Sequence, residues 1–232
     1  MVPNPQLENC FLAHAYDLKD PWGGVDGSGV KCNSKTVDKN YDCTQPWFMG
    51  PGIHPRLKKP VGARLAFAAH SLVYSASNAP VTGPTISGCT VSSGKLTVLF
   101  NDTLLGSSEL HVLPYRSEEN SAFSVAAQNG SWYAANISLS SSNTIDVDIS
   151  FLGSERPSFI RYAWGETGGN PVGDDVDCCN GYTSAGECIP GVCPLVAKTK
   201  GVIFGTLPAN PFLAKITEQG KCLCPSPQKC DA

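Results

Sequence analysis

The chain has 232 residues, of which 41% are hydrophobic and only 16% are charged, and its net charge is −3. This length is enough for one large domain or two modest ones with hydrophobic cores. The slightly acidic balance gives no basic surface for nucleic acid, and no run of about 18 apolar residues is present to span a membrane. The 23 glycines and 18 prolines, with the low charge, indicate a loop-rich, mainly β protein.

The cysteine content points to disulfides. Eleven cysteines are many for a chain in a reducing compartment. Zinc sites pair cysteines in spacings such as C-x2-C, whereas the adjacent Cys178 and Cys179 cannot easily face one metal ion. We therefore expect disulfides, no metal and no other cofactor, in a secreted, extracellular or lysosomal protein. An odd count leaves one thiol free, or paired outside this chain.

Three asparagines lie in the acceptor sequence for N-linked glycans: Asn101, Asn129 and Asn136. A chain with this content of Asn, Ser and Thr contains some acceptor sequences by chance, so they only agree with the location that the cysteines indicate. The first residues, MVPNPQLENCF, have no charged segment followed by an apolar core and do not form a signal peptide. A disulfide-rich chain without an export signal suggests that the true N-terminus lies elsewhere.

Residues 1–75 are the first of two predicted parts. The apolar run Phe11–Tyr16 is followed by Asp17, which is typical of a buried strand that ends in an acidic residue. Residues 21–52 are rich in Gly, Asp, Asn and Lys and predict a long loop, a kind of segment that is often functional or disordered.

A helix is expected to begin near Pro60, because the missing N–H of proline has no intrahelical partner in a first turn. Apolar residues recur after it at near-helical spacing: Val61, Leu65, Ala69 and Leu72. We expect this stripe to pack on a sheet.

Residues 76–232 are the second predicted part and read as β structure. Strands are expected at 95–100, 144–151 and 158–164, separated by turn signals, which fits a small antiparallel sandwich. In the second strand one face is expected to be buried: Ile145, Val147, Ile149 and Phe151. Trp132 and Trp164 are expected in the core. The cysteine-rich stretch after Gly165 is expected to be an insertion pinned by disulfides.

His54 is the histidine whose setting raises a functional question. Pro55 disfavours the α region for His54, so this residue is expected to be extended, just ahead of the helix. In an α/β domain such loops lie at the sheet edge where ligands bind. The alternative is a surface histidine beside the basic run 56–59, and spacing alone favours that alternative.

Four segments in order closely resemble the sialate O-acetylesterase family of SGNH-type hydrolases. They read AYDLKD at 15–20, IHPR-x-K-x-x-V-x-x-RL at 53–65, IRYAW at 160–164 and LPANPFLAKITEQG at 207–220. Their order and rough separation are similar to the C-terminal part of the family. The resemblance covers most of the chain, apart from the long loop and the cysteine-rich insertion.

The resemblance implies a mixed α/β and β fold. Residues 1–75 would be the C-terminal remnant of an α/β SGNH hydrolase domain, with a strand, a long loop and a helix. Residues 76–232 would be a mainly antiparallel β-sandwich domain with the cysteine-rich insertion.

The resemblance also implies an activity. In this family a serine attacks the acetyl carbonyl of an O-acetylated sugar, typically sialic acid, and a histidine in the IHPR segment accepts the proton of the serine. Water then hydrolyses the acetyl-enzyme. By its position His54 would be this general base, and an O-acetylated sugar would be the substrate.

The carboxylate that would orient His54 is displaced from its usual position. Many SGNH enzymes place an aspartate three residues before the histidine, where this chain has Pro51. Asp17 or Asp20 could substitute. Asp17 equally suits a helix or turn cap, and Asp20 beside Pro21 suits a turn better than a catalytic role.

The serine of the family is missing from its expected place. No block of the GDS or GQSN type precedes His54, and Ser28 in VDGSGV lacks the strand-to-helix setting of a nucleophile. We therefore expect an inactive C-terminal fragment that needs the missing N-terminal catalytic part of the same protein. The alternative is a non-catalytic secreted β module that binds sugar, for which Trp22 and Trp47 in the long loop would be the aromatic platform.

Overall fold

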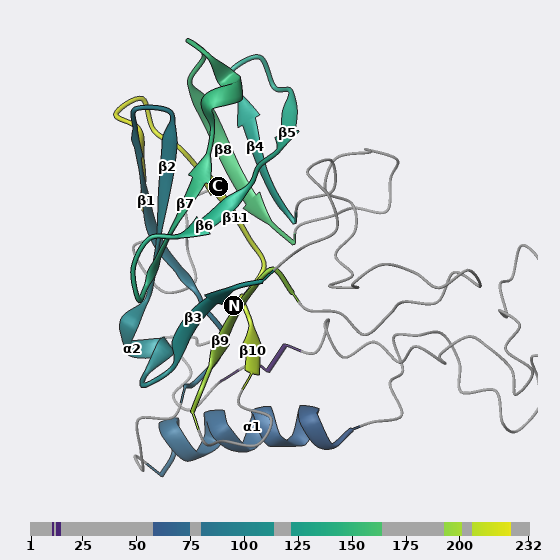
Figure 1. Cartoon of the computed structure of the whole chain (residues 1–232). Helices are drawn as coiled ribbons and strands as arrows, with labels where there is room; N and C mark the ends of the chain where they lie inside the picture. Colours follow the sequence, from purple (N-terminus) through teal and green to yellow (C-terminus); the bar gives the residue numbers. More distant parts are fainter. Residues whose placement is uncertain are drawn as a thin grey trace, which may run out of the picture.

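The computed structural model describes residues 11, 13–14, 58–74, 80–113, 122–163, 193–200 and 206–223. Most of these residues belong to three antiparallel sheets (Figure 1). The expectation of a mainly antiparallel β protein is confirmed. The division into domains at residue 75 stays a prediction.

The largest sheet has the strand order β12-β1-β2-β7-β6, with every neighbouring pair antiparallel. Its strands are β1 (Ile86–Ser92), β2 (Lys95–Phe100), β6 (Ile137–Leu139), β7 (Thr144–Asp148) and β12 (Lys221–Leu223). The expected strand at 95–100 coincides with β2. Alternate residues of β2 are buried, as is typical of a strand with one face toward a core.

A four-stranded sheet, in the order β11-β8-β4-β5, lies opposite the first (Figure 1). Its strands are β4 (Phe123–Ala127), β5 (Trp132–Ala134), β8 (Pro157–Tyr162) and β11 (Phe212–Lys215). One hydrophobic cluster draws on both sheets, with Val98 and Val147 from the first and Val125 and Ile160 from the second, all 0% exposed. The two sheets therefore share one core.

The third sheet has the order β10-β9-β3 and lies nearest the main helix (Figure 1). Its strands are β3 (Glu109–Val112), β9 (Leu195–Lys198) and β10 (Thr206–Pro208), and the helices are α1 (Lys59–Leu72), α2 (Asp102–Leu105) and the short 3₁₀ helix η1 (Ser150–Leu152). Leu195 and Ala197 of β9 join the common core, so this sheet is continuous with it. Among the described residues, no helix has the length and apolar character needed to cross a membrane.

The buried face expected for 144–151 is confirmed at three of four positions. Ile145, Val147 and Ile149 are buried, but Phe151 is 45% exposed. The strand ends at Asp148, and η1 then replaces the two-residue period with a tight turn that buries Leu152 instead. The prediction for Phe151 was therefore wrong, because the alternation was extended past the end of the strand.

The strand expected at 158–164 is shorter, and Trp132 is not a core residue. β8 ends at Tyr162, and Ala163 has a φ of 47°, a left-handed conformation that does not continue a strand. Trp132 on β5 is half-buried, and the guanidinium carbon of Arg161 lies 4.2 Å from the centre of its ring. Trp164 lies outside the described residues.

The expected helix is confirmed, but its buried face is not the one that we predicted. Leu65 is 43% exposed, whereas Arg64 and Ala68 are buried at 6% and 0%. The helix is apolar on more than one side, so the apolar spacing does not identify the side that packs. The buried positions, Arg64 and Ala68, each come one residue before a member of the expected stripe, Leu65 and Ala69.

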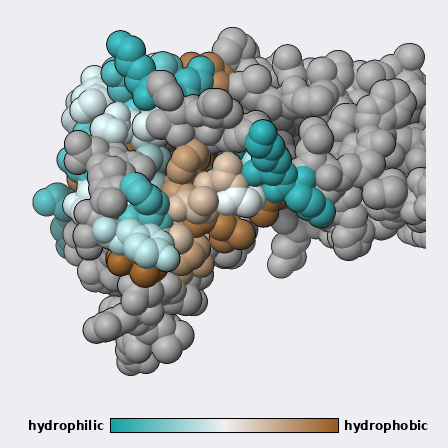
Figure 2. Space-filling view, turned by 90° about the horizontal axis from the view of Figure 1, so that it is seen from below, coloured by the Kyte–Doolittle hydropathy of each residue, from teal (hydrophilic) through white to brown (hydrophobic). Residues whose placement is uncertain are grey.

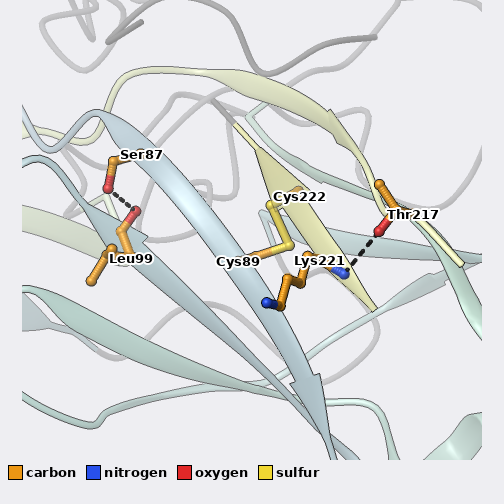
Figure 3. The surroundings of a disulfide bond; sticks show 6 residues. All are labelled: Ser87, Cys89, Leu99, Thr217, Lys221 and Cys222. Carbon is orange, nitrogen blue, oxygen red and sulfur yellow. Dashed lines mark hydrogen bonds between the residues drawn. A yellow bond between two sulfur atoms is a disulfide. The ribbon is translucent and has the colours of Figure 1, made fainter. Parts of the chain in front are cut away.

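A disulfide between Cys89 and Cys222 joins β1 to β12 at positions that are direct partners in the sheet (Figure 3). The two Cα atoms are 4.8 Å apart, and the residues are 133 positions apart in the sequence. Cys193 is also disulfide-bonded. All three cysteines in the described part of the chain are thus in disulfides. The described residues as a whole contain no group of three or more His, Cys, Asp or Glu that could hold a metal ion.

We predict that the double variant Cys89→Ala/Cys222→Ala loses about 2–4 kcal/mol of unfolding free energy, because the disulfide restricts the unfolded chain across a long loop. Urea unfolding followed by circular dichroism measures this loss. Ser87→Ala is the matched control on the same strand, since it removes only an exposed hydrogen bond of 3.1 Å to the main-chain oxygen of Leu99. A double variant as stable as this control would contradict the prediction.

Candidate functional site

The two residues that we expected to be catalytic, His54 and Asp17, lie outside the described residues, as do Asp20 and Ser28. Their roles and their proximity stay predictions. The structure does describe the segments on either side of them. Residues 13–14 precede Asp17, and α1 follows His54.

Arg64 on α1 ties this helix to two distant parts of the chain. Its Nη1 atom donates a hydrogen bond of 2.7 Å to the main-chain oxygen of His14, and its Nη2 atom donates one of 3.3 Å to the main-chain oxygen of Thr206. Arg64 is only 6% exposed. One guanidinium group therefore joins the segment before Asp17, the helix after His54, and β10.

The chemistry of arginine suits this junction. Burying a charged group is costly unless hydrogen bonds compensate it, and the planar guanidinium carries five donors in a fixed fork. The two carbonyl oxygens must therefore stay where the fork can reach them. We assigned no role to Arg64 from the sequence, although it lies in the RL pair that ends the IHPR motif. The sequence feature that could have indicated its structural role is a charged residue inside an otherwise apolar helical run.

Asn210 makes a second long-range tie from the LPANPF segment. Its Nδ2 atom donates to the hydroxyl of Thr85 at 2.7 Å, and its side chain also bonds the hydroxyl of Thr82 at 3.2 Å. Its main-chain nitrogen donates to the oxygen of Pro84 at 2.8 Å. Gly83 lies so close to Pro208 that a Cβ atom there would overlap the Pro208 carbonyl. Residues 82–85 and 206–210 are therefore held tightly together.

The junction around Arg64 has little free space. It contains a cavity of about 10 Å³, lined by Ala13, His14, Arg64, Val81, Thr82, Gly83, Leu207 and Pro208. Pockets that bind small molecules typically have volumes of about 300–1,000 Å³. This junction thus holds together the segments that lie beside the expected catalytic residues, and the described residues leave no room for a sugar ring in it.

A larger, polar groove of about 390 Å³ lies on the outer side of the five-stranded sheet, over β2, β7 and β6. Its lining is Ser93, Gly94, Lys95, Asn136, Ile137, Ser138, Asp146, Asp148 and Ser150. In the sheet, Lys95 of β2 lies directly opposite Asp148 of β7, and Ser138 of β6 lies directly opposite Asp146 of β7. Among the described residues, no histidine and no aromatic ring lines the groove.

Hydrogen bonds keep both carboxylates of this groove ionised. The Thr97 hydroxyl donates a hydrogen bond of 2.8 Å to Oδ1 of Asp146, and Nζ of Lys95 lies 3.2 Å from its Oδ2. These contacts hold the pKa of Asp146 below its ordinary value. The main-chain nitrogen of Ser150 donates to Asp148 at 2.9 Å, and this bond, with a further one from the Ser150 side chain, lowers the pKa of Asp148.

We predict that Arg64→Ala lowers the unfolding free energy by about 2–4 kcal/mol, because it removes a buried side chain and leaves two part-buried carbonyl groups without a charged donor. Arg64→Lys should recover only part of this loss, since an ammonium group cannot reproduce the fork. Urea unfolding measures both variants. Arg156→Ala is the control, because Arg156 is exposed and donates a hydrogen bond of 3.3 Å to the main-chain oxygen of Glu218. Equal stability of Arg64→Ala and Arg156→Ala would refute the role of Arg64.

We predict that Asp146→Asn lowers the melting temperature at neutral pH but not in acid. A carboxyl whose pKa is lowered from 3.8 in the folded state stabilises the fold above that pH, and the stabilisation disappears as the pH falls through the folded value. Melting curves from neutral pH to about pH 2.5 test this. Thr97→Val removes the same hydrogen bond and should show the same trend. A deficit that is constant with pH would contradict the prediction.

The comparisons with known proteins agree with the family that the four segments indicated. No protein-family model matches the chain. Human sialate O-acetylesterase is 24% identical over 225 residues, which cover 94% of this chain and 32% of that protein. The rat sialate O-acetylesterase is 26% identical over 226 residues, which cover 94% of this chain and 30% of that protein.

Among solved structures, a carbohydrate acetylesterase from Xanthomonas citri matches 71% of this chain and 30% of its own chain, at 20% identity and a TM-score of 0.46. The chain spans about a third of the length of the curated relatives that it matches. The resemblance of this chain to sialate O-acetylesterases is confirmed, at about a quarter sequence identity along nearly its whole length.

Proposed function

We propose that this chain is the histidine-bearing portion of a sialate O-acetylesterase-like hydrolase, which removes acetyl groups from O-acetylated sugars such as sialic acids. The observation that carries the proposal is the similarity to sialate O-acetylesterases over 94% of the chain, including the IHPR segment. The disulfides are consistent with a secreted or lysosomal protein.

In the proposed reaction a serine outside this chain attacks the acetyl carbonyl while His54 accepts the serine proton. His54 then donates that proton to the sugar hydroxyl as it leaves, and it activates the water that hydrolyses the acetyl-enzyme. Asp17 would orient the imidazole. The Arg64 junction supports this arrangement, because it ties α1, the helix that follows His54, to residue 14, which precedes Asp17.

The outer side of α1 supports a further part of the enzyme beside this helix. Leu65 and Val73 are 43% and 46% exposed, and Ala66 is exposed near Leu65. Figure 2 views the molecule from the side of α1 and shows hydrophobic surface gathered there. Exposed apolar side chains that gather on one surface are typical of a site that another part of a protein covers. We propose that the serine-bearing part of the enzyme covers this side.

The alternative function, a non-catalytic module that binds sugar, needs an exposed aromatic platform. Arg161 already covers one face of Trp132, and the polar groove has no aromatic ring among the described residues. Trp22 and Trp47 lie outside the described residues. Tyr133 and Phe151 are 40% and 45% exposed, with ring centres 5.3 Å apart, and are the described rings that this alternative would use. The esterase proposal is preferred because of the similarity to sialate O-acetylesterases.

We predict that His54→Ala in the full-length enzyme lowers kcat by roughly 10³-fold or more while the fold is retained. Release of acetate from 9-O-acetylated sialic acid measures the rate, and circular dichroism checks the fold. His111→Ala is the matched control, because this histidine lies on β3 with a partly exposed side chain. The 232-residue chain alone should have no enzymatic turnover. Full activity of His54→Ala would refute the role of His54.

A further inference from the structure

The three acceptor sequences for N-linked glycans have different settings in the fold. From these settings we propose that Asn129 and Asn136 carry N-linked glycans, that Asn101 does not, and that the polar groove beside Asn136 holds the first sugar of its glycan. This inference is independent of the esterase proposal, since it concerns the outer faces of the β structure.

Asn129 lies at the tip of the connection between β4 and β5. Asn129, Gly130 and Ser131 are all exposed. The main-chain nitrogen of Ser131 donates a hydrogen bond of 2.8 Å to Oδ1 of Asn129. This bond turns the amide oxygen toward the chain and places Nδ2 on the other side of the carboxamide carbon, where a sugar can extend into solvent.

Asn136 lies just before the edge strand β6 and is exposed. Its main-chain oxygen accepts a hydrogen bond of 2.9 Å from the nitrogen of Asp148, so its backbone is fixed beside β7. The residues two apart on this edge, Asn136 and Ser138, share one side of the sheet. Both line the polar groove, so a glycan on Asn136 begins at the groove itself.

Asn101 is engaged in the fold. It is half-buried and caps α2, with its Oδ1 accepting a hydrogen bond of 3.0 Å from the nitrogen of Leu104. The contrast with Asn129 is one of burial: Asn129 is exposed at the tip of a turn, whereas Asn101 is half-buried at the start of α2, beside the buried Leu104 and Leu105. A sugar on Asn101 would crowd this cap.

The modification is an ordinary group transfer from a lipid-linked oligosaccharide pyrophosphate. The Nδ2 atom of asparagine forms a bond to C1 of the sugar, the bond between C1 and the phosphate oxygen breaks, and the lipid pyrophosphate leaves with the electron pair. The amide loses one proton to a base. No oxidant or reductant is needed. The disulfide Cys89–Cys222 is consistent with the oxidising compartment in which such transfer takes place.

The groove offers the hydrogen-bonding groups that a first N-acetylglucosamine requires. Asp146 and Asp148 supply carboxylate acceptors for sugar hydroxyls, and Lys95 supplies a donor. Ser138 can act as donor or acceptor. The groove volume of about 390 Å³ is large enough for a single sugar ring, and its lining combines polar side chains with apolar surface on which a ring could rest.

The first test is a map of glycan occupancy. The chain is produced in a eukaryotic secretory host, denatured, and treated with an amidase that removes N-glycans in ¹⁸O water, which converts each occupied asparagine to labelled aspartate. Mass spectrometry should find the label at Asn129 and Asn136 and not at Asn101. Ser131→Ala and Ser138→Ala should each remove one glycan mass. A labelled Asn101, or an unlabelled Asn129 or Asn136, would overturn the assignment.

The second test addresses the groove. In the folded protein, enzymatic release of the glycan from Asn136 should be about tenfold slower than release from Asn129, because its first sugar is held by hydrogen bonds. Asp148→Asn should speed release from Asn136 and leave release from Asn129 unchanged. Glu155→Gln, an exposed carboxylate away from the groove lining, is the control. Equal release rates at the two sites would overturn the seating of the sugar in the groove.

Discussion

The placement of α1 depends on the buried guanidinium group of Arg64. This group keeps a permanent positive charge at the meeting point of three chain segments, and its two hydrogen bonds reach residues 50 and 142 positions away. A hydrophobic side chain of similar size could fill the space, but it would not select the positions of two carbonyl oxygens. The segments beside the proposed catalytic residues are thus fixed by hydrogen-bond geometry as well as by packing.

Two of the segments that resemble sialate O-acetylesterases supply residues with structural roles. Arg64 comes from the segment that also contains His54, and Asn210 comes from the segment near the end of the chain. Both residues join parts of the chain that are distant in sequence. The disulfide between Cys89 and Cys222 adds a covalent tie across 133 positions. A segment whose sequence predicts a catalytic residue can therefore also hold distant parts of the fold together.

Local patterns predicted local structure well, and failed where the outcome depended on distant partners. The strand at 95–100 and the buried positions Ile145 and Val147 follow from a period of two. Phe151 was misassigned because a 3₁₀ turn ends that period after Asp148. Apolar spacing found α1 but not its inner side, because the helix is apolar on both sides and Arg64 selects the side that packs. The partner of Cys89 could not be deduced, since spacing does not determine disulfide pairing.

The central claim is that this chain supplies the histidine, and another part of the enzyme supplies the serine. The most direct measurement is to label the active full-length enzyme with a fluorophosphonate, which forms a covalent bond with an activated serine, and to map the labelled peptide by mass spectrometry. The account predicts a labelled serine outside these 232 residues, and loss of labelling in His54→Ala. A label on Ser28 would contradict it.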